Sequence, residues 1–373
     1  MTLSPPARAL PELPPQADGV DLVWRAPTPA DVPAWRALLL AVEAADDPGE
    51  VLTEADLADE FAASWLYPEA NARFAFDPAA ACVAFGWVQC RPQHERTHRI
   101  NLWGEVHPAW RRRGLGSALL SWLLARGEAA HLELDDDQDA LLTVNVDAGR
   151  ADLRGLVDAA GLELVRSFVE MRCDLGEPRA TEPRPAEARP TGPRPAEPRP
   201  TEPRPASGLP DGLELVRWDS SWDEPARFAH NAAFADHWGS APMSPEVWQD
   251  DGIGERGVRR DLSCLAVDGE EVAGYLLAAS YPQEWLTLGW SEAWVKTLGV
   301  QRAWRRRGVA SALLATALAA FSAEGFDRAA LGVDTDSETG AVALYERFGF
   351  SSTRRIDTWG RRLPPVGEPP LTA

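Results

Sequence analysis

The chain has 373 residues, of which 45% are hydrophobic and 25% are charged, the composition of an ordinary globular protein. At roughly 100–200 residues per domain, this length predicts two or three domains. The formal net charge of −20 argues against a nucleic-acid partner, because nucleic-acid phosphates require a basic protein surface. The longest nearly apolar helical run, 310–321, is too short for a membrane span of ~20 residues, so no membrane partner is expected.

The N-terminus and the cysteines restrict the cell compartment and the metal chemistry. The segment MTLSPPARALPELPPQ lacks the basic and then apolar layout of a signal peptide, which predicts a cytoplasmic protein. The cysteines form no CxxC pair, so neither a disulfide framework nor a zinc site is expected. They are Cys82, Cys90, Cys173 and Cys264. The acidic run 135–137 is interpreted as a solvated loop, and no metal is expected.

Hydrophobic periodicity in the first half of the chain alternates between strand and helix patterns. Pairs of helices and hairpin strands precede a strand–helix–strand–helix–strand series, which predicts a mixed α/β domain. The predicted elements are strand 21–25, helices 29–44 and 53–64, hairpin strands within 72–90, strand 99–106, helix 114–130, strand 141–146, helix 149–160 and strand 162–172.

A proline-rich segment then separates the two halves of the chain. Residues 177–206 read EPRATEPRPAEARPTGPRPAEPRPTEPRPA, with a repeat of about ten residues. Proline fixes φ and removes backbone donors, so a helix or a central strand is excluded. The sequence predicts a disordered, extended spacer over 176–208.

The second half of the chain has the same order of elements. Asp268-Gly269 is a hairpin turn signal, and Ser244 followed by proline is typical of a helix start. The predicted elements are strand 213–216, helix 222–236, hairpin strands 263–267 and 271–280, strand 292–300, helix 308–324, strand 329–333, helix 338–348 and a last strand from Phe350.

An internal duplication relates the two halves. AWRRRGLGSALL (109–120) and AWRRRGVASALL (303–314) match at ten of twelve positions. A shared string of this length indicates duplication of one α/β domain. The predicted organisation is an N-terminal tail (1–19), a first domain (20–175), the spacer, a second domain (209–362) and a C-terminal tail (363–373).

The shared string lies between a predicted strand and a predicted helix, where backbone N–H groups at a helix N-terminus can bind phosphate. A Walker loop would require GK[ST], which is absent, and a Rossmann loop would require GxGxxG. The pattern Arg305-x-x-Gly308-x-Ala310, repeated as Arg111-x-x-Gly114-x-Gly116, instead resembles the pyrophosphate loop of the GNAT superfamily of acetyl-CoA-dependent acyltransferases.

The resemblance extends over 299–350, which is similar to the strand 4–helix 3–strand 5–helix 4 core of a GNAT acetyltransferase. Thr339, Gly340, Ala341, Leu344, Tyr345, Glu346, Gly349 and Phe350 fit the family's fourth-helix pattern, and Ser337 stands where asparagine is usual. The resemblance implies a tandem pair of mixed-sheet α/β GNAT domains. It also implies acetyl-CoA as the co-substrate and Tyr345 as the acid that protonates the departing thiolate. The implied acetyl-CoA contacts are Leu298, Gly299, Val300, Arg305, Arg306, Arg307, Gly308, Val309, Ala310, Ser311 and Ser337.

The first half departs from this pattern at the fourth helix. When Gly161 is aligned with Gly349, Val157 stands where the second half has Tyr345. The first half is therefore interpreted as a degenerate GNAT domain. A possible second acetyl-CoA site would comprise Val106, Arg111, Gly114 and Gly116.

Amine acetylation requires that the amine lose a proton, and Glu292 at the start of strand 292–300 is the candidate base. The alternative is a solvated glutamate at a strand end. Strict alternation would place Glu292, Trp294, Lys296 and Leu298 on one face of the strand.

The sequence thus predicts an N-acetyltransferase that acts on a primary amine of a small molecule through direct attack in a ternary complex. Catalysis is expected in the second domain, 209–362. Two alternatives remain open at this stage, a non-catalytic acetyl-CoA-binding regulatory module and a protein N-acetyltransferase. The tandem halves are compatible with a pseudo-dimer, and the sequence predicts no oligomeric state.

Overall fold

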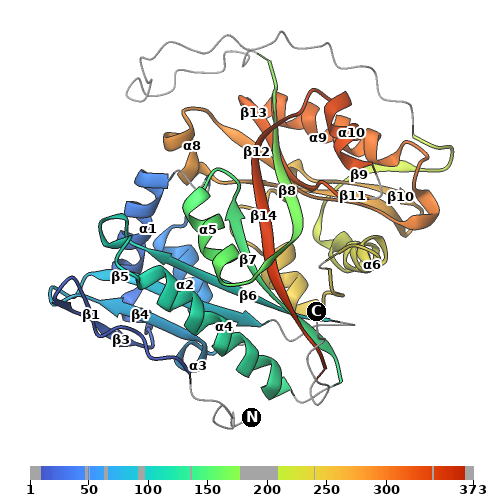
Figure 1. Ribbon diagram of the computed structural model, residues 1–373. Helices are drawn as coiled ribbons and strands as arrows, with labels where there is room; N and C mark the ends of the chain where they lie inside the picture. The colour runs from blue at the N-terminus through green and yellow to red at the C-terminus, as the bar shows by residue number, and fades with distance from the viewer. Residues whose placement is uncertain are drawn as a thin grey trace. The chain divides into compact units, whose positions relative to one another are not determined.

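The computed structural model describes residues 10–46, 49, 51–62, 66–90, 97–134, 137–176, 209–238, 240–337 and 340–365. Its contacts divide the chain into two compact units (Figure 1). Unit 1 comprises Met1–Ser167 and Ile356–Ala373, and unit 2 comprises Phe168–Arg355. The predicted spacer, apart from Gly176, lies outside the described residues, as do 1–9 and 366–373 of the two predicted tails.

Unit 1 is a mixed sheet with helices on both faces. Its sheet order is β3-β4-β5-β6-β7-β14, in which β6 and β7 are parallel and the other neighbours antiparallel. The strands are β3 (Val23–Arg25), β4 (Ala72–Phe76), β5 (Cys82–Cys90), β6 (Thr97–Val106), β7 (Asp139–Asp147) and the Ile356–Leu363 part of β14 (Ser351–Leu363), with a separate small pair β1 (Gln16–Ala17) and β2 (Val20–Asp21). The helices are α1 (Val32–Asp46), α2 (Glu54–Ala62), α3 (Pro68–Asn71), α4 (Leu115–Leu134) and α5 (Ala151–Ala159).

Unit 2 repeats this architecture. Its sheet order is β9-β10-β11-β12-β13-β8, again with one parallel pair, β12 and β13. The strands are β9 (Glu214–Arg217), β10 (Cys264–Asp268), β11 (Glu271–Ser280), β12 (Glu292–Val300), β13 (Arg328–Asp334) and the Phe168–Asp174 part of β8 (Glu163–Asp174). The helices are α6 (Asp223–Phe234), α7 (Pro245–Val247), α8 (Pro282–Leu288), α9 (Val309–Glu324) and α10 (Ala341–Arg347). The predicted α/β fold and its duplication are confirmed.

The last strand of each half of the sequence pairs in the unit that the other half mainly forms. Phe168–Asp174, encoded in the first half, pairs with β13 of unit 2, and Ile356–Leu363, encoded in the second half, pairs with β7 of unit 1 (Figure 1). Unit 2 is therefore not the consecutive segment 209–362, because its sheet requires residues that precede the spacer.

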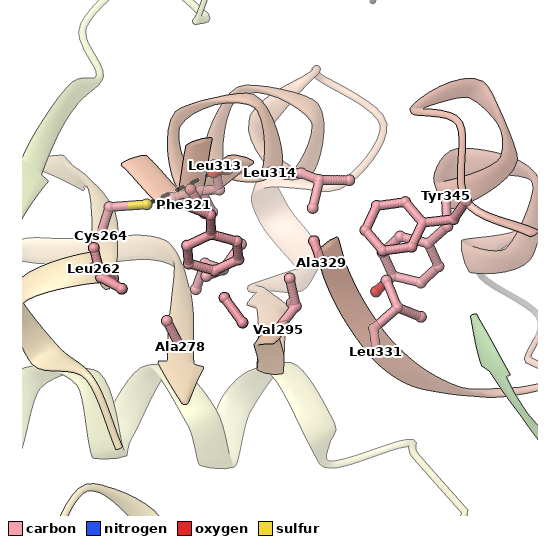
Figure 2. Close-up of a cluster of buried hydrophobic side chains, with 14 of the residues drawn as sticks. Leu262, Cys264, Ala278, Val295, Leu313, Leu314, Phe321, Ala329, Leu331 and Tyr345 are labelled. Atoms are coloured by element: carbon pink, nitrogen blue, oxygen red, sulfur yellow. Dashed lines mark hydrogen bonds between the residues drawn. The ribbon is translucent and has the colours of Figure 1, made fainter. Parts of the chain in front are cut away.

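The sheet of unit 2 is covered by apolar residues on both faces. On one face, Leu313 and Phe321 of α9 pack against Ala293 and Val295 of β12 in a single buried cluster (Figure 2). On the other face, α6 packs against β11 through a cluster that includes Tyr275. These two layers fix β12 at the centre of the unit. Among the described residues, no helix is both long and apolar enough to cross a membrane.

Candidate active site

Two parallel strands separate at the centre of unit 2. β12 and β13 pair from Glu292–Arg328 to Val295–Leu331 and then diverge, although β13 continues alongside β8 as far as Asp334–Phe168. From Lys296 onward, the β13-facing edge of β12 has no strand beside it in the described part of the chain. Backbone groups on such an edge are available to an extended ligand.

A β-bulge occurs in β12 where the strands separate. Leu277 of β11 is opposite Thr297 and the next residue, Ala278, is opposite Val295, so Lys296 is the additional residue. Bulges change the direction of side chains and are frequent beside active sites. The prediction that Leu298 shares a face with Glu292 is therefore wrong, because the bulge reverses the alternation and Leu298 packs against the α9 cluster.

After the bulge, Gly299 lies against the aromatic layer on the α6 side. A Cβ at this position would come within 2.8 Å of the Tyr275 ring and 3.0 Å of the Phe234 ring. Tyr275 is fully buried, and its hydroxyl lies 2.5 Å from Nδ1 of His230. Burial lowers the pKa of His230 to about 4, so the imidazole is neutral and shares one hydrogen bond with the phenol. The hydrogen bond between Tyr275 and His230 fixes the position of the Tyr275 ring, against which Gly299 packs.

The predicted phosphate loop connects β12 to α9. Arg306 and Gly308 have positive φ values of 60° and 89°, and α9 begins at Val309. Alternating backbone handedness directs successive N–H groups toward one point, and the positive end of the helix dipole favours an anion there. Unit 1 has the same loop, with φ values of 63° at Arg112 and 82° at Gly114.

Arg305 supports this loop with its side chain. Its Nε donates to the carbonyl oxygen of Val300 (3.1 Å) and its Nη2 to that of Ala233 (2.6 Å). The equivalent Nε of Arg111 donates to Val106 (3.0 Å). The Arg307 guanidinium lies 4.6 Å from the centre of the Trp304 ring. Arg305 therefore holds the loop against the end of β12, which leaves phosphate binding to backbone N–H groups.

Tyr345 lies on α10 at the edge of the α9 cluster, beside Leu331 (Figure 2). Its side chain is buried, and the Phe350 ring packs edge-on at 5.9 Å. Burial raises the pKa of Tyr345 to about 12, so the phenol retains its proton at neutral pH. A neutral phenol can donate a proton to a thiolate, which is the chemistry predicted for this residue.

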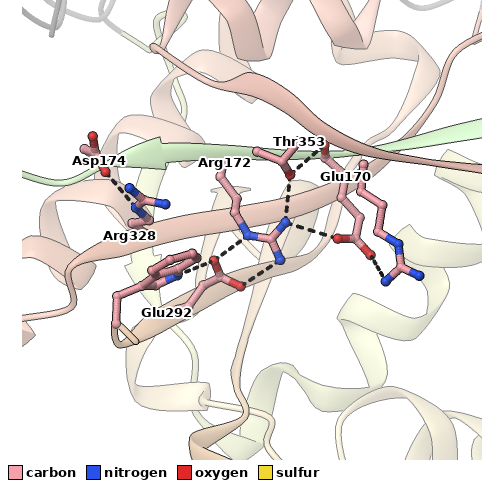
Figure 3. Close-up of polar contacts among 8 residues, drawn as sticks. Glu170, Arg172, Asp174, Glu292, Arg328 and Thr353 are labelled. Atoms are coloured by element: carbon pink, nitrogen blue, oxygen red, sulfur yellow. Dashed lines mark hydrogen bonds and ion pairs between the residues drawn. The ribbon is translucent and has the colours of Figure 1, made fainter. Parts of the chain in front are cut away.

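Glu292 is held in an ion pair that the sequence did not indicate. It is 1% exposed, and its carboxylate accepts from Arg172 Nε (2.8 Å), Arg172 Nη2 (3.4 Å) and Trp290 Nε1 (3.2 Å) (Figure 3). Arg172 and Trp290 occupy the approach to this buried carboxylate, so an incoming amine has no direct access to it. Glu292 is therefore not a solvated glutamate at a strand end. The prediction that it acts as a base stays a prediction.

The remaining predicted contact, Ser337, lies in the turn that follows β13. Its backbone N–H donates to the carbonyl oxygen of Asp334 (3.3 Å). The adjoining residues 338 and 339, which belong to the fourth-helix pattern, lie outside the described residues. α10 begins after Gly340, whose φ is 70°.

Unit 1 shares the loop with unit 2 but differs at the bulge and at the positions of Gly299 and Tyr345. β5 and β6 pair continuously from Ala84–Val106 to Cys90–Ile100, so the counterpart of β12 has no bulge. Glu105 stands at the position of Gly299. The carbonyl of Val157 accepts from Leu162 N–H just as the carbonyl of Tyr345 accepts from Phe350 N–H, both at 3.1 Å, which places Val157 at the equivalent position.

An ion-pair bridge links the phosphate-loop arginine of unit 1 to its fourth helix. Asp46, at the end of α1, accepts from Arg111 Nη1 (2.8 Å) and Nη2 (2.5 Å) and from Arg150 Nη1 (2.5 Å), just before α5. Glu105 is near these arginines, but burial dominates and raises its pKa to about 7. Nothing in the local sequence around Asp46 indicated this contact, since it joins residues far apart in the chain.

Similarity to known proteins extends over more than half of the chain. The model of the acetyltransferase (GNAT) family matches residues 43–141 and 223–350. A mycothiol acetyltransferase of Clavibacter michiganensis is 32% identical over 260 residues, which are 69% of this chain and 70% of that protein. A mycothiol acetyltransferase of Salinispora tropica is 31% identical over 266 residues, 66% of this chain and 68% of that protein.

Solved structures share the fold at low identity. A GCN5-related N-acetyltransferase from Sphaerobacter thermophilus superposes with a TM-score of 0.66 at 22% identity, covering 92% of this chain and 96% of that one. A tandem GNAT protein from the clavulanic acid biosynthesis pathway superposes with a TM-score of 0.62 at 18% identity, covering 94% and 100%.

Proposed function

Because the chain belongs to the GNAT acetyltransferase family, we propose that unit 2 transfers the acetyl group of acetyl-CoA to a primary amine of a small molecule. The supporting observation is the coincidence, in unit 2, of the strand separation, the bulge at Lys296, the positive-φ loop and Tyr345. Unit 1 has the separation and the loop without the bulge or the phenol, so we assign it no catalysis.

The residues of unit 2 fit acetyl-CoA at three places. The N–H groups of the loop from Arg306 to Ser311 would hold the pyrophosphate, and the open edge of β12 would receive the extended pantetheine arm. Backbone N–H groups between Leu298 and Val300 would stabilise the charge that develops on the carbonyl oxygen. Bound acetyl-CoA supplies an activated thioester carbonyl to the acceptor.

The reaction is direct attack in a ternary complex. The amine nitrogen forms the new C–N bond as the C–S bond breaks, and one proton leaves the nitrogen. Tyr345 gives its proton to the departing thiolate, because a neutral phenol near the sulfur is a better acid than water. Because Arg172 is bound to the Glu292 carboxylate, an amine cannot reach Glu292 directly. We propose that the amine loses its proton to solvent, or to a carboxylate through a bridging water molecule.

The names of the relatives suggest the class of acceptor. Since the similar proteins are mycothiol acetyltransferases, we propose an acceptor of the same kind, a small molecule with a primary amine, used in the cytoplasm. The acidic chain, with a net charge of −20, favours the approach of a cationic amine.

The test is the consumption of acetyl-CoA in the presence of amines, followed by chromatographic separation of acetyl-CoA from CoA, because two members of the panel are themselves thiols. The panel contains D-glucosamine, cysteamine, L-cysteine methyl ester and spermidine, and mass spectrometry identifies the acetylated product. Turnover with any member supports the enzyme. Tight acetyl-CoA binding without turnover would support a regulatory acetyl-CoA-binding module instead.

A further inference from the structure

We propose that Glu170, on the strand that the first half of the chain contributes to unit 2, binds the ammonium group of the acceptor. This inference rests on the proposed function, because it concerns the acceptor of the same reaction. It makes the exchanged strand part of the substrate-binding wall.

Strand register places Glu170 at the opening between β12 and β13. Glu170 is opposite Gly332, the first residue of β13 beyond the last β12–β13 pair, Val295–Leu331. Residues directly opposite one another project from the same face of a sheet. A Cβ on Gly332 would have no atom within 4 Å, so this face of β13 is open at the residue opposite Glu170.

Asp334, at the end of β13, is 4% exposed and accepts from the N–H of Asp336 (2.9 Å). Two other carboxylates near this opening also have close partners. Glu292 accepts three hydrogen bonds and is 1% exposed. Glu255 accepts from the Tyr281 hydroxyl (2.8 Å) through one oxygen and is ion-paired with Lys296 through the other. Neither offers a free oxygen at short range to an incoming ammonium group.

Glu170 has longer contacts. Its Oε2 is 3.2 Å from Arg172 Nη1 and its Oε1 is 3.9 Å from Arg354 Nη1, and 14% of its side chain is exposed. An ionised carboxylate can accept about four hydrogen bonds, so capacity remains on both oxygens. An ammonium group could therefore add to Glu170 without displacing either arginine.

The neighbouring arginine is fixed in place, which gives Glu292 a role in this arrangement. Arg172 is bound to Glu292 through Nε and Nη2, and its Nη1 donates to the Thr353 hydroxyl (2.7 Å) as well as to Glu170 (Figure 3). Glu292 orients Arg172, and Arg172 orients Glu170. Glu292 is thus a positioning residue for an acceptor-binding carboxylate.

Aromatic residues flank the same opening. Phe168, two residues from Glu170 on the same face of β8, contacts Trp238 with ring centres 6.1 Å apart. An aromatic surface beside a carboxylate suits an amine attached to a polar carbon skeleton, since the carboxylate binds the charge and the rings cover the C–H surface.

The test compares Glu170→Gln with Asp174→Asn, using whichever amine of the four-member panel gives the highest kcat/KM. Asp174 is on the same strand and face but pairs with Arg328 (2.8 Å), where β12 and β13 are still joined. We expect Glu170→Gln to raise the KM for the amine about 10- to 100-fold, with kcat and the KM for acetyl-CoA within about threefold of the unmodified chain. Asp174→Asn should leave all three values within about twofold.

A charge-retaining variant of Glu170 and the turnover of the unmodified chain complete the test. Glu170→Asp, which retains the charge, should give a KM for the amine well below that of Glu170→Gln, whereas a merely structural role would give no such rescue. Equal KM values for Glu170→Gln and Asp174→Asn would overturn the inference while leaving the proposed function intact. Absence of turnover by the unmodified chain with every amine would overturn the proposed function, and this inference with it.

Discussion

Arg172 Nε lies 2.8 Å from Oε2 of Glu292, although the two residues are 120 positions apart and come from different halves of the duplicated sequence. The contact occurs because Phe168–Asp174 pairs with β13 inside unit 2. A unit built in this way cannot be excised as one copy of the repeat. The spacer directly follows β8 in the chain, so it connects Phe168–Asp174 to the rest of unit 2.

This arrangement predicts the behaviour of fragments. The segment 209–362 lacks Arg172, so Glu292 would be buried without its partner, at a cost of about 3–5 kcal/mol, and the edge of β13 would be exposed. We expect this fragment to be insoluble or unfolded by circular dichroism. The fragment 168–355, which matches unit 2, should show a cooperative melting transition. A well-folded 209–362 fragment would contradict the structural importance of the exchanged strand.

The two phosphate loops provide a matched pair of substitutions. Gly308 and Gly114 have φ values of 89° and 82°, so Glu at either position carries a similar backbone strain of about 1–2 kcal/mol. Gly308→Glu also places a carboxylate where the pyrophosphate would bind, and should reduce turnover at least about 100-fold. Gly114→Glu should leave turnover within a few-fold. Equal losses of turnover, measured at matched folded fraction, would refute the assignment of catalysis to unit 2.

Glu105 predicts a pH dependence of stability. Burial raises its pKa to about 7 in the folded chain, above the ~4.3 of an exposed glutamate. The folded state therefore binds this proton more tightly than the unfolded state does. The free energy of unfolding consequently falls as the pH rises from about 4 to 7, because the unfolded chain loses the proton first.

Replacement by Gln should remove this dependence. We expect Glu105→Gln to stabilise the chain at pH 8 by about 1–3 kcal/mol and to change its stability little at pH 4. Denaturant unfolding at the two pH values provides the measurement. If the free energies of unfolding of the variant and the unmodified chain differ by the same amount at both pH values, the Glu105 carboxyl does not titrate in this range.

The sequence predicted the parts of the site that depend on local pattern. The string from Ala303 to Leu314 predicted the loop and the helix after it, and the Gly161–Gly349 alignment correctly paired Val157 with Tyr345. Helix α8 was missed, although Pro282 at its start and Gly289 after its end, with a φ of 80°, are ordinary helix boundaries.

The remaining features depend on contacts between distant segments. The strand exchange is set by the pairing of β8 with β13, and no pattern within β8 distinguishes that partner from one in its own half. The bulge at Lys296 depends on register against β11, so strict alternation placed Leu298 on the wrong face. Glu292 was singled out correctly as a charged group at the strand start, but its partner could not be read from its neighbours.

Tyr345 provides the most direct test of the mechanism, because Tyr345→Phe removes one hydroxyl and keeps the ring among Leu331 and Phe350. If the phenol protonates the thiolate, turnover should fall about 100-fold or more with acetyl-CoA affinity unchanged, since the loop and β12 hold the rest of the molecule.

Tyr275→Phe is the matched control for this substitution, because it deletes another buried phenol of unit 2. The Tyr275 hydroxyl is bound to His230, on the α6 side of the sheet. Its loss should cost about 1 kcal/mol of stability, since a buried hydrogen bond disappears, and should leave turnover within a few-fold. Steady-state rates, acetyl-CoA binding by calorimetry and melting temperatures of both variants distinguish the two roles. A rate constant that is unchanged by Tyr345→Phe, with the best amine of the panel, would remove this residue from the mechanism, because a phenol that donates no proton contributes only packing that the phenylalanine ring retains.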